Sequence, residues 1–531
     1  MRLLWIGCLI FLLLFILYPL ARVLSEAGIK SWVKVFSASR WSEPLVHTLE
    51  LMVLSTLFSV LMGFIYAYAI MRGGLPLARF FSFIPVLHLV TPPFVGGLSF
   101  ILLFGRQGFF TKTLLHKDIS LYGLPGLLIA QTLCFFPIAF LIIRGVFEGM
   151  NPSLEYAARN AGAGRFRVFR TITLPLVLPG VVSAVLFIAI SVLSDFGNPM
   201  LIGGRFNVLA VELYTRLTGW AEAGTSAVLG IILLFPALVL FVLQRFLFYK
   251  KNSRLATIGS RSSAMPSALP SLPVRALLFI FCAFISFIVI AQFLAVIGGA
   301  FSRIWGVDSS FTLKHLTDSM SYRTELLNTL FFAFAAAAGT AALAALIAFF
   351  VFRTELPFRK TVDSVVMIPA ALPGSLIGLA YVLAFNGGIL ALTGTRAIIV
   401  LVMIACDLPA AYRILSSSVQ RIRTSLDDSA RALGASRMRL FFTIICPLIL
   451  RGIISAFVYT FVRAAGTLSA VIFLITFHTK LTSVLILNLA AQGDWGRSAA
   501  LALILTVVIF VVLGLLRLAG GKQLFKDMFD R

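Results

Sequence analysis

Long apolar stretches separated by short polar segments dominate the chain. Runs of roughly 20 apolar residues, the length of a helix that crosses a bilayer, indicate about twelve membrane spans. They are expected near residues 3–22, 45–70, 80–104, 124–146, 176–196, 224–248, 276–300, 326–352, 362–385, 397–418, 448–474 and 498–518. No A-x-A cleavage site follows the first run before Glu26, so we expect a retained helix and not a removed signal peptide. The pattern predicts an all-α polytopic membrane protein.

The polar segments between these spans are basic on alternate sides of the membrane. With a cytoplasmic N-terminus, one side carries most of the basic residues: Arg72, Arg79, Arg159, Arg165, Arg167, Arg170, Lys250, Lys251, Arg254, Arg261, Arg275, Arg353, Arg359, Lys360, Arg421, Arg423, Arg431, Arg437, Arg439, Lys522, Lys526 and Arg531. Such a bias marks the cytoplasmic side. Both termini are therefore expected in the cytoplasm.

Composition narrows the class further. Of 531 residues, 60% are hydrophobic and 12% are charged, with a mean hydropathy of +1.02, which excludes a soluble enzyme and a disordered chain. In a soluble protein a net charge of +24 would indicate nucleic-acid binding. In this chain we expect the basic residues to orient the spans in membrane lipid instead, and we expect no nucleic-acid partner. The five cysteines make no CxxC pair or metal-binding spacing; they are Cys8, Cys134, Cys282, Cys406 and Cys446.

The chain contains an internal repeat. A basic, Ser/Pro-rich linker at 250–275 separates two six-span halves, 1–249 and 276–531. A shift of 272 residues places Glu155–Ala184 on Asp427–Ala456, with about half of the positions identical, and a shift of 281 matches Arg72 with Arg353. Six spans in each half predict parallel repeats, related by an axis along the membrane normal.

The best-preserved part of the repeat is a cytoplasmic loop between the fourth and fifth spans of each half. Its sequence predicts a short helix that ends at Gly162 or Gly434, where glycine favours a helix C-cap, followed by a cationic turn. Pro175 and Pro447 then lie near the first turn of the next span. Membrane packing alone would not single out this loop, whereas a duplicated docking surface would.

These segments resemble the EAA loop of the permease subunits of bacterial ABC importers, in which E-A-A is followed by a spaced Gly and Ile-x-Leu-Pro. The first copy has Tyr156-Ala157-Ala158, Gly162 and Ile172-Thr173-Leu174-Pro175. The second has Asp428-Ser429-Ala430, Gly434 and Ile444-Ile445-Cys446-Pro447. Tyr156 replaces the acidic residue, with Glu155 one place earlier; Asp427 precedes Asp428; and Cys446 replaces Leu.

The resemblance implies a type I ABC importer permease fold, in which each loop, 151–175 and 423–447, carries a helix that docks on a cytoplasmic ATPase dimer. The implied docking residues are Glu155, Tyr156, Ala157, Ala158, Gly162, Asp427, Asp428, Ser429, Ala430 and Gly434. No G-x-x-x-x-G-K-[ST] run occurs, so the chain is not expected to be an enzyme or to bind a cofactor. ATP and Mg would bind the partner ATPase. The resemblance also implies an extracytoplasmic solute-binding protein and a bacterial cytoplasmic (inner) membrane.

The fused twelve-span layout resembles the ferric-iron permeases, and also the thiamine permeases. The stretch Ser194–Pro199, with Asp195 and Asn198, is similar to an Asp-Phe-Gly stretch in the ferric-iron permeases, and Gly466–Ser469, with Thr467, is its counterpart. Ferric iron is the leading expected substrate. Phosphonate, sulfate and polyamine permeases are related, so thiamine or another small solute stays open.

Two carboxylates near or inside spans are candidates for the substrate path. Asp195, at the outer end of a span, either meets a passing hard cation or caps and pairs locally. Asp407 either lines the path or pairs with Arg413. Glu50 and His88 are expected to pack against polar neighbours. No cluster of His, Cys and carboxylates is dense enough to predict a resident metal.

Two other classes of function remain as alternatives. A secondary transporter with parallel repeats would need intramembrane charges for ion coupling, but not a duplicated docking loop. A membrane-embedded enzyme would need an acid/base or metal constellation, which the sequence does not contain.

Overall fold

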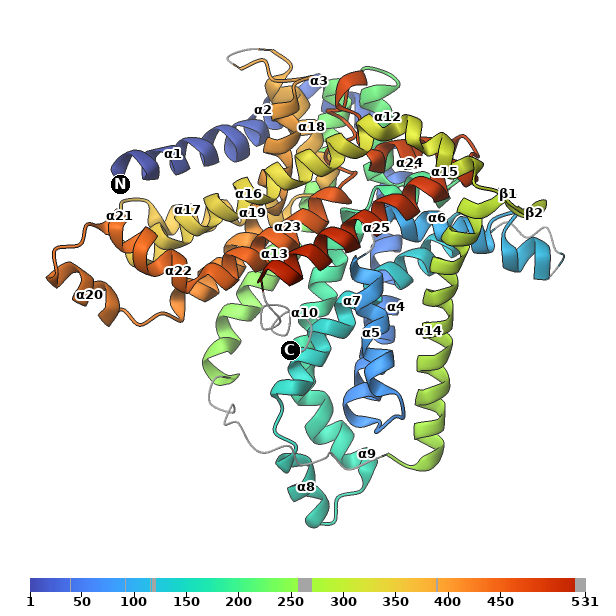
Figure 1. Ribbon diagram of the computed structural model, residues 1–531, viewed down its shortest axis with the longest axis horizontal. Coiled ribbons are helices and arrows are strands. Elements are labelled where there is room, and N and C mark those ends of the chain that lie inside the picture. Colours follow the sequence, from blue (N-terminus) through green and yellow to red (C-terminus); the bar gives the residue numbers. More distant parts are fainter. Residues whose placement is uncertain are drawn as a thin grey trace. The chain divides into compact units, whose positions relative to one another are not determined.

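The computed structural model describes residues 1–38, 40–90, 92–114, 116, 121–255, 270–387 and 390–520. These residues are almost entirely helical (Figure 1), and one short antiparallel hairpin joins β1 (Ser302–Ile304) to β2 (Asp308–Phe311). Most of the predicted linker 250–275, and the tail residues Lys522, Lys526 and Arg531, lie outside the described residues. The prediction of an all-helical polytopic membrane protein is confirmed.

Single helices form most of the expected spans. Within the described part of the chain, nine helices are long and apolar enough to cross a membrane, or up to eleven if two bent pairs each count as one span. One bent pair, Arg359–Ala371 with Gly374–Phe385, turns by 110°; the other, Arg437–Leu448 with Leu450–Ala465, turns by 72°. The expected span at 80–104 is instead two short helices, Ala78–Val90 and Pro93–Phe104, because consecutive prolines at 92 and 93 cannot continue a helix.

The described helices form two compact units. Unit 1 consists of Met1–Trp41, Leu209–Leu234 and Thr312–Arg531. Its helices are α1 (Arg2–Leu12), α2 (Tyr18–Glu26), α3 (Ile29–Ser37), α12 (Leu209–Thr218), the start of α13 (Ala223–Leu255), α15 (Lys314–Ser319), α16 (Arg323–Arg353), α17 (Arg359–Val366), α18 (Gly374–Phe385), α19 (Arg396–Gln420), α20 (Ser425–Ala432), α21 (Arg437–Leu440), α22 (Cys446–Leu448), α23 (Leu450–Ala465), α24 (Thr482–Ala491) and α25 (Trp495–Gly520).

The N-terminal span belongs to the core of unit 1. Trp5, Cys8, Leu12 and Ile16 recur every three or four residues, so they form one stripe that packs among helices of the second sequence half. The Trp5 indole N–H donates to the Pro357 carbonyl at 3.2 Å. The remaining faces of α1 expose apolar side chains, as expected for a helix in lipid.

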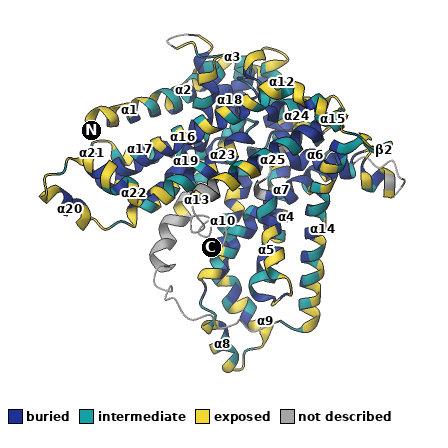
Figure 2. Cartoon of the chain, viewed as in Figure 1, coloured by how far each residue is buried: buried dark blue, intermediate teal, exposed yellow. Residues whose placement is uncertain are grey.

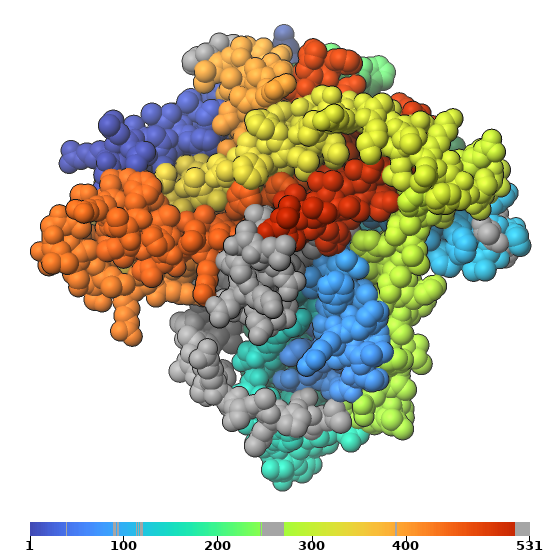
Figure 3. Space-filling model, in the orientation of Figure 1, coloured from blue at the N-terminus to red at the C-terminus, as the bar shows by residue number. Residues whose placement is uncertain are grey.

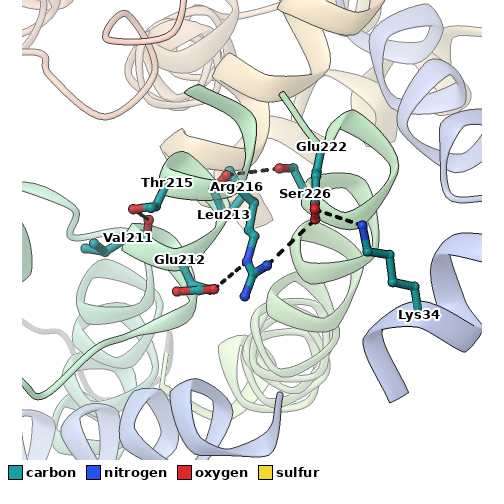
Figure 4. Close-up of polar contacts among 8 residues, drawn as sticks. All are labelled: Lys34, Val211, Glu212, Leu213, Thr215, Arg216, Glu222 and Ser226. Carbon is teal, nitrogen blue, oxygen red and sulfur yellow. Dashed lines mark hydrogen bonds and ion pairs between the residues drawn. The ribbon is translucent and has the colours of Figure 1, made fainter. Parts of the chain in front are cut away.

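A cluster of opposite charges ties α3 to α12 and α13 in unit 1 (Figure 4). Lys34 donates to Glu222 at 2.8 Å, and Arg216 lies 2.7 Å from Glu212 and 3.8 Å from Glu222. Glu222 directly precedes α13, so the positive N-terminal end of that helix dipole also stabilises its carboxylate. The hydrogen bond from Lys34 is the main reason that the pKa of Glu222 is lowered.

Unit 2 consists of Ser42–Val208 and Phe235–Phe311. Its helices are α4 (Ser42–Arg72), α5 (Ala78–Val90), α6 (Pro93–Phe104), α7 (Leu124–Gly149), α8 (Ser153–Asn160), α9 (Arg165–Val168), α10 (Leu174–Leu193), α11 (Gly197–Ile202), the rest of α13, and α14 (Leu272–Phe301). Short π-helical turns connect some of these segments, including η3 (Phe169–Thr173) in unit 2 and η1 (Leu13–Leu17) and η6 (Phe441–Ile445) in unit 1.

The first span of the second sequence half packs inside unit 2. Tyr66 on α4 lies 3.0 Å from the Ser286 hydroxyl on α14, and the Trp305 indole N–H donates to the Leu102 carbonyl at 2.8 Å. The other face of α14 exposes large apolar residues (Figure 2), including Leu277, Ile280 and Phe284. Each unit thus combines helices from both of the predicted halves, 1–249 and 276–531.

Candidate functional site

The two repeated loops have matching geometry. The short helices α8 and α20 each span eight residues and are followed by glycines in the left-handed region, with φ of +86° at Gly162 and +77° at Gly434. A four-residue helix and a π-helical turn then lead toward Pro175 and Pro447. Because a proline disrupts the helical hydrogen-bond ladder one turn before it, a π-helical turn at this place accommodates it.

A buried ion pair anchors the first loop. The Arg72 guanidinium, at the end of α4, lies 3.2 Å from the Glu155 carboxylate on α8, and both side chains are 8% exposed. Thr173 donates a further hydrogen bond to Glu155 at 2.9 Å. The Arg72 guanidinium also stacks over the Phe147 ring at 5.6 Å. Glu155 therefore fastens the loop to the membrane helices.

An equivalent pair anchors the second loop. Arg353, at the end of α16, lies 3.2 Å from the Asp427 carboxylate on α20, with side chains 3% and 7% exposed. Arg353 also donates to the Val419 carbonyl at 2.6 Å and to the Ile422 carbonyl. The same arginine–carboxylate contact thus holds both copies of the loop, although the supporting contacts differ.

The remaining predicted loop residues divide by exposure. Ala157, Asp428 and Ser429 are exposed, Tyr156 and Ala158 are half-buried, and Ala430 is buried. In Figure 3 the teal segment that contains α8 and the orange segment that contains α20 both reach the surface of the view. In each copy the buried acidic residue lies one position before the acidic position of the EAA pattern.

The spans that follow the loops pack closely on the preceding spans. A Cβ atom at Gly180 of α10 would lie 2.6 Å from Val146 on α7, and one at Gly452 of α23 would lie 2.5 Å from Ser418 on α19. These positions correspond under the 272-residue shift. In each copy the spans before and after the loop therefore pack closely at the same position.

Asp195 lies in a network of neutral donors in unit 2. Its carboxylate accepts hydrogen bonds from the side-chain amides of Gln131 at 2.9 Å and Asn198 at 2.8 Å. Ser55 in turn donates to Gln131 at 2.8 Å. The backbone N–H of Asn198 donates to Asp195 at 3.3 Å, so the carboxylate also caps the start of α11. The described contacts of Asp195 are thus local ones, and its place in the substrate path stays a prediction.

Thr467, the counterpart of Asp195, contributes differently in unit 1. Its backbone carbonyl accepts a hydrogen bond from Ser483 at 2.8 Å, and its side chain is half-buried. The carboxylate network of the first repeat is therefore not reproduced by a carboxylate in the second.

Asp407 on α19 pairs with Arg463 on α23. The two side chains approach to 3.7 Å; the Asp407 side chain is 7% exposed and that of Arg463 is 60% exposed. The expected partner Arg413 does not pair with it, because residues six apart on an α-helix point to different faces. The Asp407–Arg463 contact thus joins two packed candidate spans, α19 and α23, through opposite charges.

The other candidate groups have no shared site. His88 is buried, whereas Glu50 is exposed on α4 and not packed as expected. Each of the five cysteines is unbridged. Among the described residues no group of three or more His, Cys, Asp or Glu could hold a metal ion.

Three residues that the sequence pattern did not assign take part in these contacts: Arg353, Arg463 and Gln131. Of these three, only Arg353 had a sequence signal. It matches Arg72 under the repeat, and an arginine kept in both copies suggests that both pair with the same kind of group. Arg463 and Gln131 have no charged or amide counterpart in the other half, so the repeat does not reveal them.

Comparison with known proteins agrees with this geometry. The chain matches the family described as "Binding-protein-dependent transport system inner membrane component" over residues 59–251 and 341–522. It is 33% identical over 478 residues to the ferric transport system permease protein FbpB of Actinobacillus pleuropneumoniae, covering 87% of this chain and 68% of that protein.

Two further relatives broaden the comparison. A putative ferric transport system permease protein, FbpB 1 of Haemophilus influenzae, is 33% identical over 445 residues, covering 81% of this chain and 69% of its own length. The molybdenum transport system permease protein ModB of Escherichia coli is 31% identical over 220 residues, covering 40% of this chain and 95% of ModB.

Proposed function

This chain belongs to the family of binding-protein-dependent transport system inner membrane components, and from that membership we propose that it carries ferric iron across the inner membrane. It is the permease component of an ABC importer and is not itself an enzyme. The relatives named for ferric transport align with most of this chain, which supports iron as the substrate.

The observation that carries the coupling role is the pair of equivalent anchored loops. In each copy an arginine at the end of a membrane helix holds a loop carboxylate at 3.2 Å, while other residues of the short helix stay exposed. We infer that α8 and α20 dock on the two subunits of a cytoplasmic ATPase dimer. ATP and Mg bind those subunits, and their closure moves both loops together.

The anchors define how such a movement reaches the membrane. A buried ion pair resists separation, because breaking it leaves an uncompensated buried charge. The loop, the end of α4 or α16, and the span after the loop therefore move together. In this mechanism Glu155 and Asp427 are positioning residues, and the docking contacts come from exposed neighbours such as Asp428 and Ser429.

Uptake into proteoliposomes tests the proposed function. The full chain, its ATPase and its binding protein are reconstituted with ATP inside, and accumulation of radiolabelled ferric iron is measured. Uptake that requires ATP and the binding protein is expected. Uptake that persists without ATP and collapses with the proton gradient would show a secondary transporter instead.

The substrate is tested in the same vesicles. Molybdate, sulfate and thiamine are offered as labelled alternatives, because a molybdenum permease aligns with part of this chain and thiamine permeases have a similar layout. Ferric iron is expected to be the transported solute. ATP-dependent uptake of another solute, with no uptake of iron, would support the importer function and show that iron is not its substrate.

A further inference from the structure

A cavity in unit 2 has a strongly basic lining that the transport mechanism does not use. It has a volume of about 810 Å³ and is lined by His47, Arg106, Tyr122, Gly123, Gly204, Arg205 and Phe206. His47 comes from the start of α4, Arg106 from the turn after α6, and the others from the segments before α7 and after α11. None of these described lining residues is acidic.

Its two arginines are available to a ligand. Arg106 and Arg205 are both exposed, and neither forms an ion pair with any carboxylate in the described part of the chain. Arg303 in the same unit differs, because it lies 3.7 Å from Asp308. Two unpaired guanidinium groups in one cavity present forked donors that match the oxygens of a carboxylate or a phosphate.

The walls of the cavity are fixed by contacts of their own. The His47 ring stacks on Phe206 with centroids 4.1 Å apart, and His47 Nδ1 lies 3.0 Å from the Asn207 carbonyl, to which it donates. The Gly123 N–H donates to the Ile202 carbonyl at 2.9 Å, which joins the segment before α7 to the end of α11. Burial raises the pKa of Tyr122, and the neighbouring Arg106 opposes that rise.

We propose that this cavity binds an anionic oxygen group of the carboxylate or phosphate class, held by Arg106 and Arg205. The cavity lies at the end of unit 2 where α4 begins, which is the outer side in the predicted topology. The ligand therefore arrives from outside the cell membrane. The binding of an anion is argued from the cavity itself, whereas the two sources of that anion named below rest on the proposed function.

The place of the cavity near the Asp195 network, together with its two arginines, restricts which ligands it can bind. On both α4 and α7 the network around Asp195 lies eight residues beyond the cavity, at Ser55 and Gln131, or roughly 12 Å along each helix. An uncomplexed ferric ion is repelled by the two arginines. The ligand is therefore either an anion that accompanies the metal or a carboxylate presented by the external binding protein, and these two sources share one chemistry.

Binding to the full chain tests the shared chemistry. The chain and its ATPase are placed in phosphatidylcholine nanodiscs, and calorimetric titrations are made with inorganic phosphate and with citrate. The variants are Arg106→Gln/Arg205→Gln and the matched control Arg303→Gln, which removes one charge from a paired site outside the cavity. Saturable binding is expected, weakened about tenfold or more by the double variant and unchanged by the control.

Capture of the binding protein on the same nanodiscs tests the second source. If the double variant weakens capture and free anions do not bind, the ligand is a carboxylate of the binding protein. If it weakens anion binding alone, the ligand is a free or metal-borne anion. If neither measurement responds more to the double variant than to Arg303→Gln, the proposal is wrong.

Folding and transport are separated from this result. Both arginines are exposed, so the variants are expected to elute and assemble with the ATPase as the parent does. Arg205→Lys keeps the charge and loses the fork, so it should weaken binding less than Arg205→Gln. Binding is measured without transport. A chain that fails to import iron would therefore overturn the proposed function, whereas the binding titrations alone decide whether the cavity binds an anion.

Discussion

Arg353 holds Asp427 at 3.2 Å in a site where both side chains are almost completely buried. The arginine ends one membrane helix and the carboxylate belongs to the short helix α20 of the second repeated loop, so this contact joins the loop to the membrane helices. Arg72 and Glu155 form the same contact in the other copy.

Removing one partner of this pair should damage the loop. Arg353→Gln leaves Asp427 buried without a cation, at a cost of about 3–5 kcal/mol. We expect a lower unfolding temperature and a loss of ATPase-coupled uptake, measured by thermal denaturation and in proteoliposomes. Arg353→Met/Asp427→Leu should be less destabilised than the single variant, because it buries no unpaired charge. The neighbouring Asp428→Asn serves as the exposed control, and equal destabilisation by Asp428→Asn would contradict the anchoring role.

Gly162 offers a second test of the loop through its backbone. A residue with a Cβ at φ +86° costs about 1–2 kcal/mol, although nothing lies within 4 Å of that position. Gly162→Ala should therefore weaken ATPase association, measured by co-purification. Gly164 has φ of −64° and equally open surroundings, so Gly164→Ala should leave association unchanged. If Gly162→Val and Gly434→Val keep both transport and ATPase association, the docking role is wrong.

The charge cluster on α3 predicts a pH dependence of stability. The pKa of Glu222 is lowered in the folded chain, chiefly by the hydrogen bond from Lys34. A lowered carboxyl pKa contributes stability above the pKa of the unfolded chain, and that stability is lost as the pH falls through the lower folded value. Glu222→Gln should flatten the acid side of the unfolding-temperature profile.

The matched lysine variants identify the partner. Lys34→Gln should flatten the same acid side, whereas Lys30→Gln, on the same helix and exposed, should preserve the parent profile. An unchanged profile in Lys34→Gln would show that this contact does not set the shift.

The Asp407–Arg463 contact predicts a difference between two arginines. Arg463→Gln leaves a buried carboxylate without its partner inside a candidate span, which should cost about 1–3 kcal/mol of stability. Arg413→Gln removes a charge of the same sign from α19 without unpairing Asp407, and should cost much less. Thermal denaturation of the purified variants compares them, and a reversed order would contradict the pairing.

The apolar pattern predicted most of the helices, because the length and hydropathy of a span are local properties of the chain. The span expected at 80–104 shows where this fails: two prolines at 92 and 93 divide it into two short helices. The repeat likewise located both loops and the glycines that end α8 and α20, since a left-handed C-cap is a local requirement.

The sequence by itself determined an all-helical membrane protein, the two matching loops and the family to which they point. Only the tertiary structure decided that Glu155 and Asp427 face inward toward arginines, that Asp407 meets Arg463, and that Arg106 and Arg205 line one cavity. The physical reason is that hydropathy and turn chemistry act between neighbours in the chain. An ion pair or a cavity depends on which helices pack together, and these ion pairs join residues 56 or more apart in the chain.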